Sequence, residues 1–371
     1  MDSLLKILSG ADTSLRGRTL RCATAVVEPF YAGMMIARNA AITRNILRSA
    51  HLLPPTISVG NITTGGTGKT PVVSWLAARL RDAGEHPAVL MRGYRSNAAG
   101  FSDEQAVLER GLNSTNASPA IPIEANPNRV AGAVAVLKRH GDVNIFILDD
   151  GFQHRRVRRE FDLVLINATA PFGFGHVLPR GLLREPLGGL RRASAFLITR
   201  ASLATDDQLN AIRSELSRRN AAAPIYHADH VQTALWSPMN QTRLPLDAIR
   251  DEAIYSVCGI GDPAAFHTQV GRLTSRHVAQ RTFADHHAYT PADVDRIIAD
   301  AHAANASRIV TTEKDWVKLA AIDAAQRAQP PFTVAELGIR FHGDDEARLL
   351  AQIQSTIAKT TGAKKGCTVE G

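Results

Sequence analysis

The segment from Thr63 to Thr70 contains the residue types of a loop that binds nucleotide phosphates. It lies between a β-branched run and a helical pattern, and it reads Thr63, Thr64, Gly65, Gly66, Thr67, Gly68, Lys69, Thr70. In such loops backbone N–H groups and a helix N-terminus bind phosphate oxygens, the lysine reaches the β- and γ-phosphates, and the last hydroxyl can bind Mg²⁺. The spacing predicts a site for ATP or GTP with Mg²⁺, although Thr63 stands where the general pattern has glycine.

Two adjacent acids, Asp149 and Asp150, follow the apolar run at 144–148. A carboxylate in this position orients Mg²⁺ and its waters in phosphoryl-transfer sites. Successive side chains of an extended chain point in opposite directions. We therefore expect one acid to face metal or phosphate and the other to hold a neighbouring loop, and the sequence leaves open which is which.

Several further side chains follow predicted strands or lie in the arginine-rich stretch after the acids. Arginines near a nucleotide site often bind phosphates, whereas most charge runs are simply solvated surface. The candidates for substrate or phosphate contacts are Arg92, Tyr94, Gln153, His154, Arg180 and Arg184.

Buried-strand patterns alternate with helical patterns through the first two thirds of the chain. The strand candidates are 56–59, 88–91, 144–148, 162–166 and 195–198, and a helical stretch covers 128–139. This alternation predicts an α/β fold of the P-loop NTPase type, with a mostly parallel sheet and helices on both faces. Functional groups should gather where the strands end.

The same alternation restarts near residue 225 and predicts a smaller second α/β domain. We expect a P-loop nucleotide-binding domain over 51–224, the second domain over 225–350, and a flexible tail over 351–371. Within the second domain, Thr311 or Thr312 is expected to cap a helix whose first turn is acidic.

The chain has 371 residues, of which 44% are hydrophobic and 21% charged, as in ordinary globular proteins. Three widely spaced cysteines predict neither a disulfide framework nor a cysteine zinc site, and they fit a reducing cytoplasm. The formal net charge of +8 favours anionic partners. Half of it, from seven basic and three acidic groups, falls within the first fifty residues.

Residues 1–50 are expected to form a helical segment that associates with a membrane. Its apolar stretch from Ala23 to Ala37 is interrupted by Glu28 and Pro29, and a spanning helix needs about 20 apolar residues, so it should not cross a bilayer. A basic, apolar, proline-kinked segment is typical of an interfacial anchor. The alternative is a helix packed on the protein's own core, and this segment alone does not separate the two.

The ordered motifs VGNITTGGTGKTP, RGY, SDE, LDDGFQH, LLREP, FADHH and TEKDWVKL closely resemble the tetraacyldisaccharide 4′-kinase family, the lipid A kinases of Gram-negative bacteria, over roughly residues 5–345. The resemblance implies ATP-dependent phosphorylation of the 4′-hydroxyl of a tetraacylated glucosamine disaccharide 1-phosphate, at the cytoplasmic face of the inner membrane. It also implies a P-loop domain, a smaller α/β domain joined by a β-ribbon, and an N-terminal membrane-binding helix.

Carried over residue by residue, the resemblance gives Lys69 and Thr70 the phosphate and Mg²⁺ roles. Asp103 matches the family's catalytic aspartate, Glu104 its metal-associated neighbour, and His286 the histidine that partners the aspartate, so that the two domains would close to assemble the site. His287 beside it leaves that last assignment open. A sugar hydroxyl needs such a group to accept its proton, because its pKa lies far above neutrality. Local departures, FSDEQ for VGDEP and RGYRS for RGYGR, concern loop shape.

Two other functions share some of these sequence features. A membrane-associated P-loop ATPase switch of the partitioning type also has a GGTGKT loop, but the lysine usual just before its glycines is absent here. Nucleic-acid binding is not expected, because aromatic residues are too few for stacking. The expected partners are an acylated disaccharide lipid and the anionic surface of the inner membrane, and the expected oligomeric state is a monomer.

Overall fold

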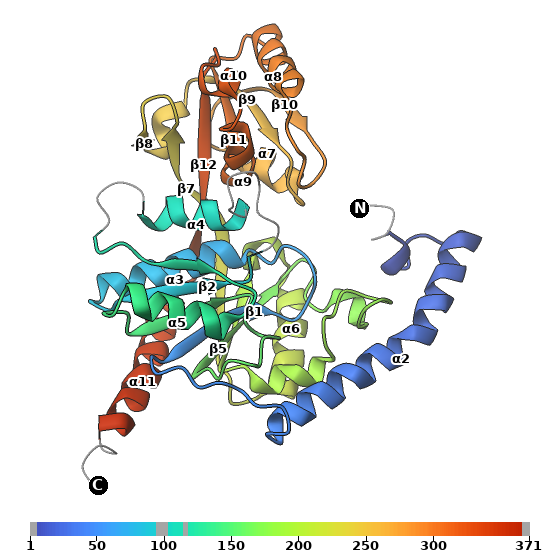
Figure 1. The fold of residues 1–371 in the computed structure, drawn as a ribbon. Coiled ribbons are helices and arrows are strands. Elements are labelled where there is room, and N and C mark those ends of the chain that lie inside the picture. Colours follow the sequence, from blue (N-terminus) through green and yellow to red (C-terminus); the bar gives the residue numbers. More distant parts are fainter. Residues whose placement is uncertain (1–5, 94–102, 114–117, 366–371) are drawn as a thin grey trace. The chain divides into compact units, whose positions relative to one another are not determined.

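The computed structural model describes residues 6–93, 103–113 and 118–365. The chain divides into two compact units, shown in Figure 1. Unit 1 contains Met1–Arg92, Ser118–Asp229 and Phe341–Gly371, and unit 2 contains Gly93–Ala117 and His230–Arg340. The predicted boundary at 224/225 falls close to the change of unit at Asp229. The assignment of 93–117 to unit 2 was not expected from the sequence.

Unit 1 is built on a parallel sheet with the strand order β7-β6-β5-β1-β4-β2-β3. Its strands are β1 (Thr56–Asn61), β2 (Pro87–Met91), β3 (Ile123–Ala125), β4 (Ile145–Asp149), β5 (Phe161–Asn167), β6 (Ala195–Thr199) and the start of β7 (Ile225–Ser237). Every residue of β1, β2, β4 and β6 is buried. Strands covered on both faces have continuous apolar sequences, which explains why these runs were visible in the sequence.

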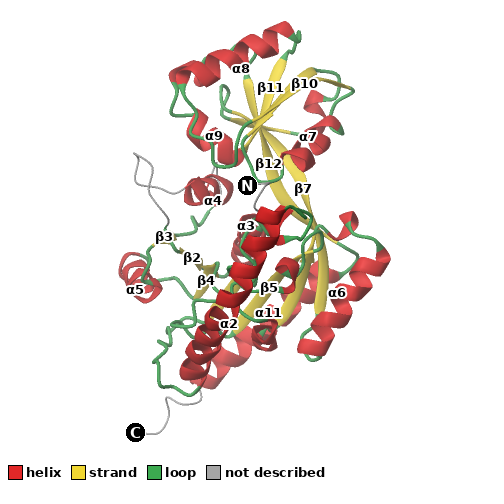
Figure 2. Cartoon of the chain, turned by 90° about the vertical axis from the view of Figure 1, so that its right-hand side faces the viewer, coloured by secondary structure: helices red, strands yellow, loops and turns green. Residues whose placement is uncertain are grey.

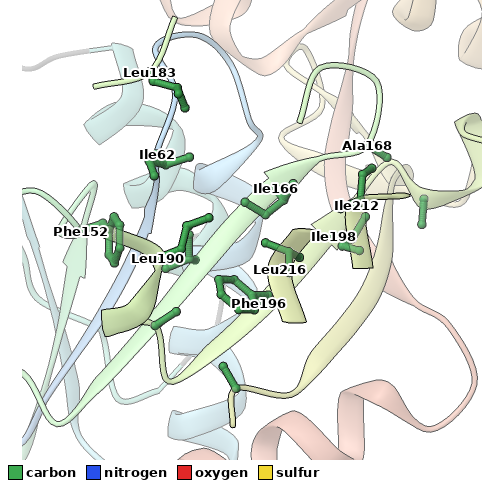
Figure 3. Packing of buried hydrophobic residues seen from close by; sticks show 14 of the residues in the cluster. Ile62, Phe152, Ile166, Ala168, Leu183, Leu190, Phe196, Ile198, Ile212 and Leu216 are labelled. Carbon is green, nitrogen blue, oxygen red and sulfur yellow. The ribbon is translucent and has the colours of Figure 1, made fainter. Parts of the chain in front are cut away.

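The helical elements of unit 1 are α2 (Leu15–Thr43), α3 (Lys69–Asp82), α5 (Arg129–Arg139), α6 (Asp206–Arg219) and α11 (Asp345–Lys365), with 3₁₀ turns η1 (Gly173–Gly175), η2 (Leu187–Arg192) and η3 (Ala201–Leu203). In Figure 3, Ile212 and Leu216 of α6 lie near Phe196 and Ile198 of β6 in one buried cluster. Unit 1 therefore has the predicted α/β architecture, with helices packed on a parallel sheet.

Unit 2 contains the other part of the same sheet, in which the strands β10-β9-β11-β12 are neighbours in this order and parallel; Figure 2 labels β10, β11 and β12. Its strands are β8 (Thr242–Leu244), β9 (Ala253–Cys258), β10 (Arg276–Thr282), β11 (Arg308–Thr312) and β12 (Phe332–Phe341). Its helices are α4 (Asp103–Asn113), α7 (Pro263–Gly271), α8 (Pro291–Ala303), α9 (Glu313–Leu319) and α10 (Asp323–Gln326), with the 3₁₀ turn η4 (Leu246–Ile249). The strands β7 and β12, neighbours in the strand order, each run from one unit into the other. The Thr312 side chain accepts from the Asp315 N–H, which confirms the predicted helix cap.

The C-terminal segment differs from the prediction. The expected flexible tail from residue 351 is wrong, because α11 is helical as far as Lys365. Leu349, Ile353 and Ile357, spaced four apart, are buried on one face of this helix. An apolar stripe at this spacing orders a helix whose composition is otherwise polar.

The N-terminal segment forms one continuous helix, α2, with Pro29 inside it. It begins at a cap in which the Ser14 side chain accepts from the Gly17 N–H. Met35 and Ile42 are buried, whereas Val26, Phe30 and Met34 are exposed. The helix thus packs on unit 1 along one face and leaves an apolar face uncovered.

Candidate active site

The glycine loop connects β1 to α3, as the motif predicts. Gly65 has a φ of 111° and Gly68, which caps α3, has a φ of 71°, and both values favour glycine. A Cβ atom on Gly65 or Gly66 would meet nothing within 4 Å. Backbone conformation, rather than crowding within the protein, therefore explains the glycine at position 65.

Thr63 can replace a glycine because its segment is extended. It forms an isolated bridge with Leu183, and the Thr64 N–H donates to the Leu182 carbonyl at 2.7 Å. The Arg184 N–H donates in return to the Ile62 carbonyl at 2.8 Å. The first part of the loop is therefore held against residues 182–184, and the glycine-dependent turn begins at Gly65.

Lys69, Asp150 and Arg184 form a charge cluster at the end of the sheet. The Lys69 ammonium lies 3.3 Å from Asp150 Oδ1 and 3.4 Å from Asn61 Oδ1, and Arg184 Nη1 lies 2.6 Å from Asp150 Oδ2. Burial raises the pKa of Asp150, but the charges of Lys69 and Arg184 outweigh it and hold the pKa below its ordinary value. One ionised carboxylate thus holds two cations beside the glycine loop.

The two adjacent acids have different surroundings. Asp149 is the buried last residue of β4 and lies beside Val59 of β1. Asp150 follows with a φ of 53°, so the backbone turns there. Asp150 is therefore the acid that contacts Lys69.

Gln153 contacts other parts of the protein through its amide nitrogen, which donates to the Asn61 carbonyl at 2.9 Å and to Glu185 at 3.1 Å. Glu185, which was not predicted as a site residue, is buried and also accepts from Asn39 at 2.8 Å and from Arg192 at 2.9 Å. Only its place in the LLREP motif, directly after Arg184, could have indicated it.

His154 is a neutral residue among arginines. Burial, together with the positive charges of Arg129 and Arg159, lowers its pKa to about 4. At neutral pH its imidazole can donate or accept a hydrogen bond but adds no positive charge for a phosphate. Its backbone N–H donates to the Gly151 carbonyl at 2.8 Å.

The remaining phosphate candidates lie in different environments. Arg92 is exposed directly after β2, and Tyr94 lies outside the described residues. Arg180 is 3.1 Å from Glu28 of α2. Thr70 is buried in the first turn of α3, and the Thr67 hydroxyl is buried and, within the described residues, has no hydrogen-bond partner.

Asp103 lies in unit 2, at the first residue of α4. Its carboxylate is 3.2 Å from the ammonium of Lys318 on α9, and the neighbouring Glu104 is exposed. The α4–α9 packing is also supported by Arg110, which lies 3.0 Å from Glu313. Lys318 was not predicted from the sequence, because it is more than two hundred residues away along the chain.

The two adjacent histidines of unit 2 have different surroundings. His287 contacts Asp293 at 3.1 Å and stacks on Phe283. The His286 side chain is 73% exposed, and its closest charged partner is Asp285 at 4.0 Å. Between the described residues Asp103 and His286 there is neither a hydrogen bond nor an ion pair, so this structure does not bring the predicted pair together.

The loop that carries His286 is held from below by Asp315. This buried carboxylate accepts from the Gly259 N–H at 3.0 Å and from the Tyr289 hydroxyl at 3.0 Å. The His286 N–H in turn donates to the Gly259 carbonyl at 3.1 Å. The backbone position of His286, whose φ is 60°, is thereby fixed while its side chain stays exposed.

The chain is similar to known proteins over most of its length. The model of the tetraacyldisaccharide-1-P 4′-kinase family matches residues 20–358. The tetraacyldisaccharide 4′-kinase of Halothermothrix orenii is 32% identical over 359 residues, covering 91% of this chain and 92% of that protein. The corresponding protein of Anaeromyxobacter sp. (strain K) is 35% identical over 331 residues, covering 85% and 84%. A crystal structure of LpxK from Aquifex aeolicus in complex with ATP has a TM-score of 0.68 over 91% of this chain and 99% of that chain. At 23% identity that likeness shows a common fold.

Proposed function

This chain belongs to the tetraacyldisaccharide 4′-kinase family, and on that premise we propose that its glycine loop and nearby acids transfer the γ-phosphoryl group of ATP to the 4′-hydroxyl of a tetraacyl glucosamine disaccharide 1-phosphate. The observation that carries the proposal is the cluster of Lys69, Asp150 and Arg184 at a P-loop of this family. The partitioning-type ATPase is not favoured, because the family match extends over residues 20–358.

On the donor side, the loop N–H groups and Lys69 would bind the phosphates. Phosphoryl transfer spreads negative charge over the γ-phosphate oxygens, so fixed cations stabilise its transition state. Asp150 holds Lys69 and Arg184 together beside the glycine loop. The two cations are thus placed where we propose that the phosphates bind.

The residues present fit Mg²⁺. Thr70, Asp149 and Asp150 supply the oxygen donors that Mg²⁺ prefers, and no group of three or more acidic, histidine or cysteine ligands is found among the described residues. In the usual Mg²⁺ site of a kinase, waters and substrate phosphates provide most ligands. We assign Thr70 and Asp149 to the ion, because Asp150 already pairs with both cations. When bound, Mg²⁺ would neutralise charge on the β- and γ-phosphates.

On the acceptor side, Asp103 would accept the proton of the 4′-hydroxyl. Its carboxylate lies 3.2 Å from the Lys318 ammonium, and a carboxylate is a group that can accept a hydroxyl proton. His286 is the better of the two histidines for a partner role, because it is exposed whereas His287 is held by Asp293 and Phe283.

The direct test measures transfer of labelled γ-phosphate from Mg·ATP to a detergent-dispersed tetraacyl glucosamine disaccharide 1-phosphate. We expect labelled lipid only when the acceptor is present. Hydrolysis of ATP at the same rate without the acceptor would overturn the proposal.

We propose that the enzyme acts at the cytoplasmic face of the inner membrane. No helix among the described residues is long and apolar enough to cross a bilayer. The exposed face of α2 offers Val26, Phe30 and Met34, four residues apart, and the exposed Arg16 and Arg18 near the start of the same helix can meet anionic headgroups.

A vesicle assay tests this surface. We expect Phe30→Asp, at a side chain 76% exposed, to reduce co-sedimentation with vesicles that contain phosphatidylglycerol. Leu203→Asp, at a side chain 61% exposed on η3, is the matched control and should bind like the wild type. Equal binding by both variants would argue against α2 as the membrane surface.

A further inference from the structure

The buried face of α2 carries polar side chains as well as apolar ones. Glu28, Tyr31 and Asn39 are partly buried on the side that also contains Met35 and Ile42, opposite the exposed Phe30. A helix that served only as an anchor would need only apolar contacts to dock on its own protein, because buried polar groups must find partners. The partners of these three residues therefore show what else the helix holds.

The first partners are backbone and side-chain groups next to the charge cluster of Lys69, Asp150 and Arg184. The Tyr31 hydroxyl donates to the Arg184 carbonyl at 2.9 Å, and Asn39 Nδ2 donates to Glu185 at 2.8 Å. Arg38 donates to the Gln153 carbonyl at 3.0 Å. Side chains of α2 thus reach the segments at 153 and at 184–185, which carry three residues of the site.

Glu28 is the second anchoring point. Its carboxylate lies 3.0 Å from His176 Nδ1 and 3.1 Å from Arg180, and it accepts from the Val177 N–H at 3.2 Å. Burial raises the pKa of Glu28, but Arg180 and His176 outweigh it and hold the pKa below its ordinary value. Glu28 is therefore ionised at neutral pH and fixes the beginning of the segment that ends at Arg184.

The other end of this segment contacts the nucleotide loop. Residues 182–184 exchange backbone hydrogen bonds with Ile62 and Thr64, and the Arg184 side chain pairs with Asp150, which pairs with Lys69. A continuous series of contacts thus leads from α2 through the 176–185 segment to the loop lysine. Every contact in it is formed within unit 1.

We infer that Glu28 and Tyr31 of α2 are positioning residues for phosphoryl transfer, because they hold the 176–185 segment in the place where Arg184 meets Asp150. The inference rests on the proposed assignment of the glycine loop to ATP. In this inference the exposed face of α2 contacts a lipid surface, while its buried face maintains the geometry of the charge cluster. Removal of α2 should then cost turnover on detergent-dispersed substrate as well as membrane binding.

Point variants separate the inner face from the outer one. Tyr31→Phe removes a single donor, Glu28→Gln removes the charge but keeps an acceptor for the Val177 N–H, and Glu28→Ala removes both. We expect kcat to fall about tenfold in Glu28→Ala and less in Glu28→Gln and Tyr31→Phe. A small displacement of a cation that stabilises the transition state lowers the rate of the reaction. Vesicle binding should stay at the wild-type level in all three.

Two control variants match these changes. Glu215, on α6, pairs with Arg218 and Arg219 and has a side chain 15% exposed, against 16% for Glu28. Tyr226 donates to Gln352 at 3.0 Å, away from the site. Glu215→Gln and Tyr226→Phe should keep wild-type kcat, and thermal melts of all variants report general loss of stability.

The outcomes are distinct. Absence of acceptor-dependent transfer in the wild type would overturn the proposed function itself. Normal transfer in the wild type, with kcat unchanged in Glu28→Gln, Glu28→Ala and Tyr31→Phe, would overturn the positioning role alone. If Glu28→Ala does not fold, the comparison of Glu28→Gln and Tyr31→Phe with their controls decides. The inference would also be contradicted if kcat fell equally in the control variants and in proportion to the loss of melting temperature.

Discussion

The charge cluster of unit 1 and the proposed base of unit 2 are organised differently. In unit 1, Lys69 and Arg184 both pair with Asp150, which directly follows β4. Lys69 also lies 3.4 Å from the side chain of Asn61, the last residue of β1. In unit 2, Asp103 pairs with Lys318 while His286 extends into solvent. The difference teaches that the cations proposed to bind phosphate are brought together by one carboxylate at a strand end, whereas the residues proposed for proton removal are held separately, on a helix start and on a loop.

The largest effect on kcat should come from a substitution in the charge cluster. Lys69→Met is expected to lower kcat roughly 10³-fold, because one fixed positive charge at the transferring phosphoryl group is lost. Steady-state assays with the lipid acceptor measure this loss. Lys138→Met, at an exposed lysine of α5, is the control and should leave kcat unchanged. A similar kcat for both variants would remove Lys69 from the reaction.

Next in size is the loss of the proposed base. Asp103→Asn should lower kcat roughly 10²-fold, because the amide cannot accept the hydroxyl proton. Lys318→Met, which removes only the ion-pair partner at 3.2 Å, should cost less. Single-turnover assays would separate the two, and an equal loss in both variants would show that Asp103 and Lys318 act as one unit.

A smaller effect is expected where the His286 loop is supported. Burial and the nearby Asp315 carboxylate raise the pKa of the Tyr289 hydroxyl, which therefore stays protonated and donates to Asp315. Tyr289→Phe leaves a buried carboxylate oxygen with one donor fewer, which should lower the free energy of unfolding by about 1–2 kcal/mol. Urea unfolding measures this, and unchanged stability would show that Asp315 holds the loop without Tyr289.

An effect of similar size concerns the stability of unit 2 towards acid. Burial and the neighbouring His277 lower the pKa of His267, which lies 2.6 Å from Ser256, to about 4. Its ordinary value is about 6.5, so the unfolded chain takes up this proton first. The contribution of the neutral, buried His267 to the free energy of unfolding is complete above about pH 6.5 and is lost as the pH falls towards 4.

Urea unfolding at pH 7 and pH 5 tests this dependence. The wild type should lose about 1–2 kcal/mol more between these values than His267→Gln does. The exposed His140 provides the control variant, His140→Gln, whose loss should match the wild type. An identical pH dependence in His267→Gln would contradict a neutral buried His267.

The sequence predicted the parts of the fold that depend on local patterns. The buried strands, the glycine loop and the Thr312 cap each have a signature within a few residues. The single helix α2 was less predictable, because Pro29 usually interrupts a helix at a cost of about 3 kcal/mol. Contacts of α2 with distant segments stabilise it, and no local pattern indicates those contacts.

The same distinction applies to the site. Lys69 and the acid pair follow from the motif and from its position after strands. Lys318 beside Asp103 and Glu28 beside Arg180 join residues far apart in the sequence, so neither pairing has a local signal. The sequence also could not show that Asp103 and His286 form neither a hydrogen bond nor an ion pair with each other, since this depends on how α4 and the 285–289 loop pack.

The discontinuity of unit 1 has a consequence for how the protein is made. Its last helix, α11, packs through Glu346 against Trp75 and through Gln352 against Tyr226, yet it follows the whole of His230–Arg340 in the chain. At ~5–20 residues per second of synthesis, a ribosome needs roughly ten seconds between completing β7 and releasing α11. During that interval the apolar surface that Leu349 and Ile353 later cover is open to chaperones, so production of the enzyme should depend on chaperone supply more than its finished stability would suggest.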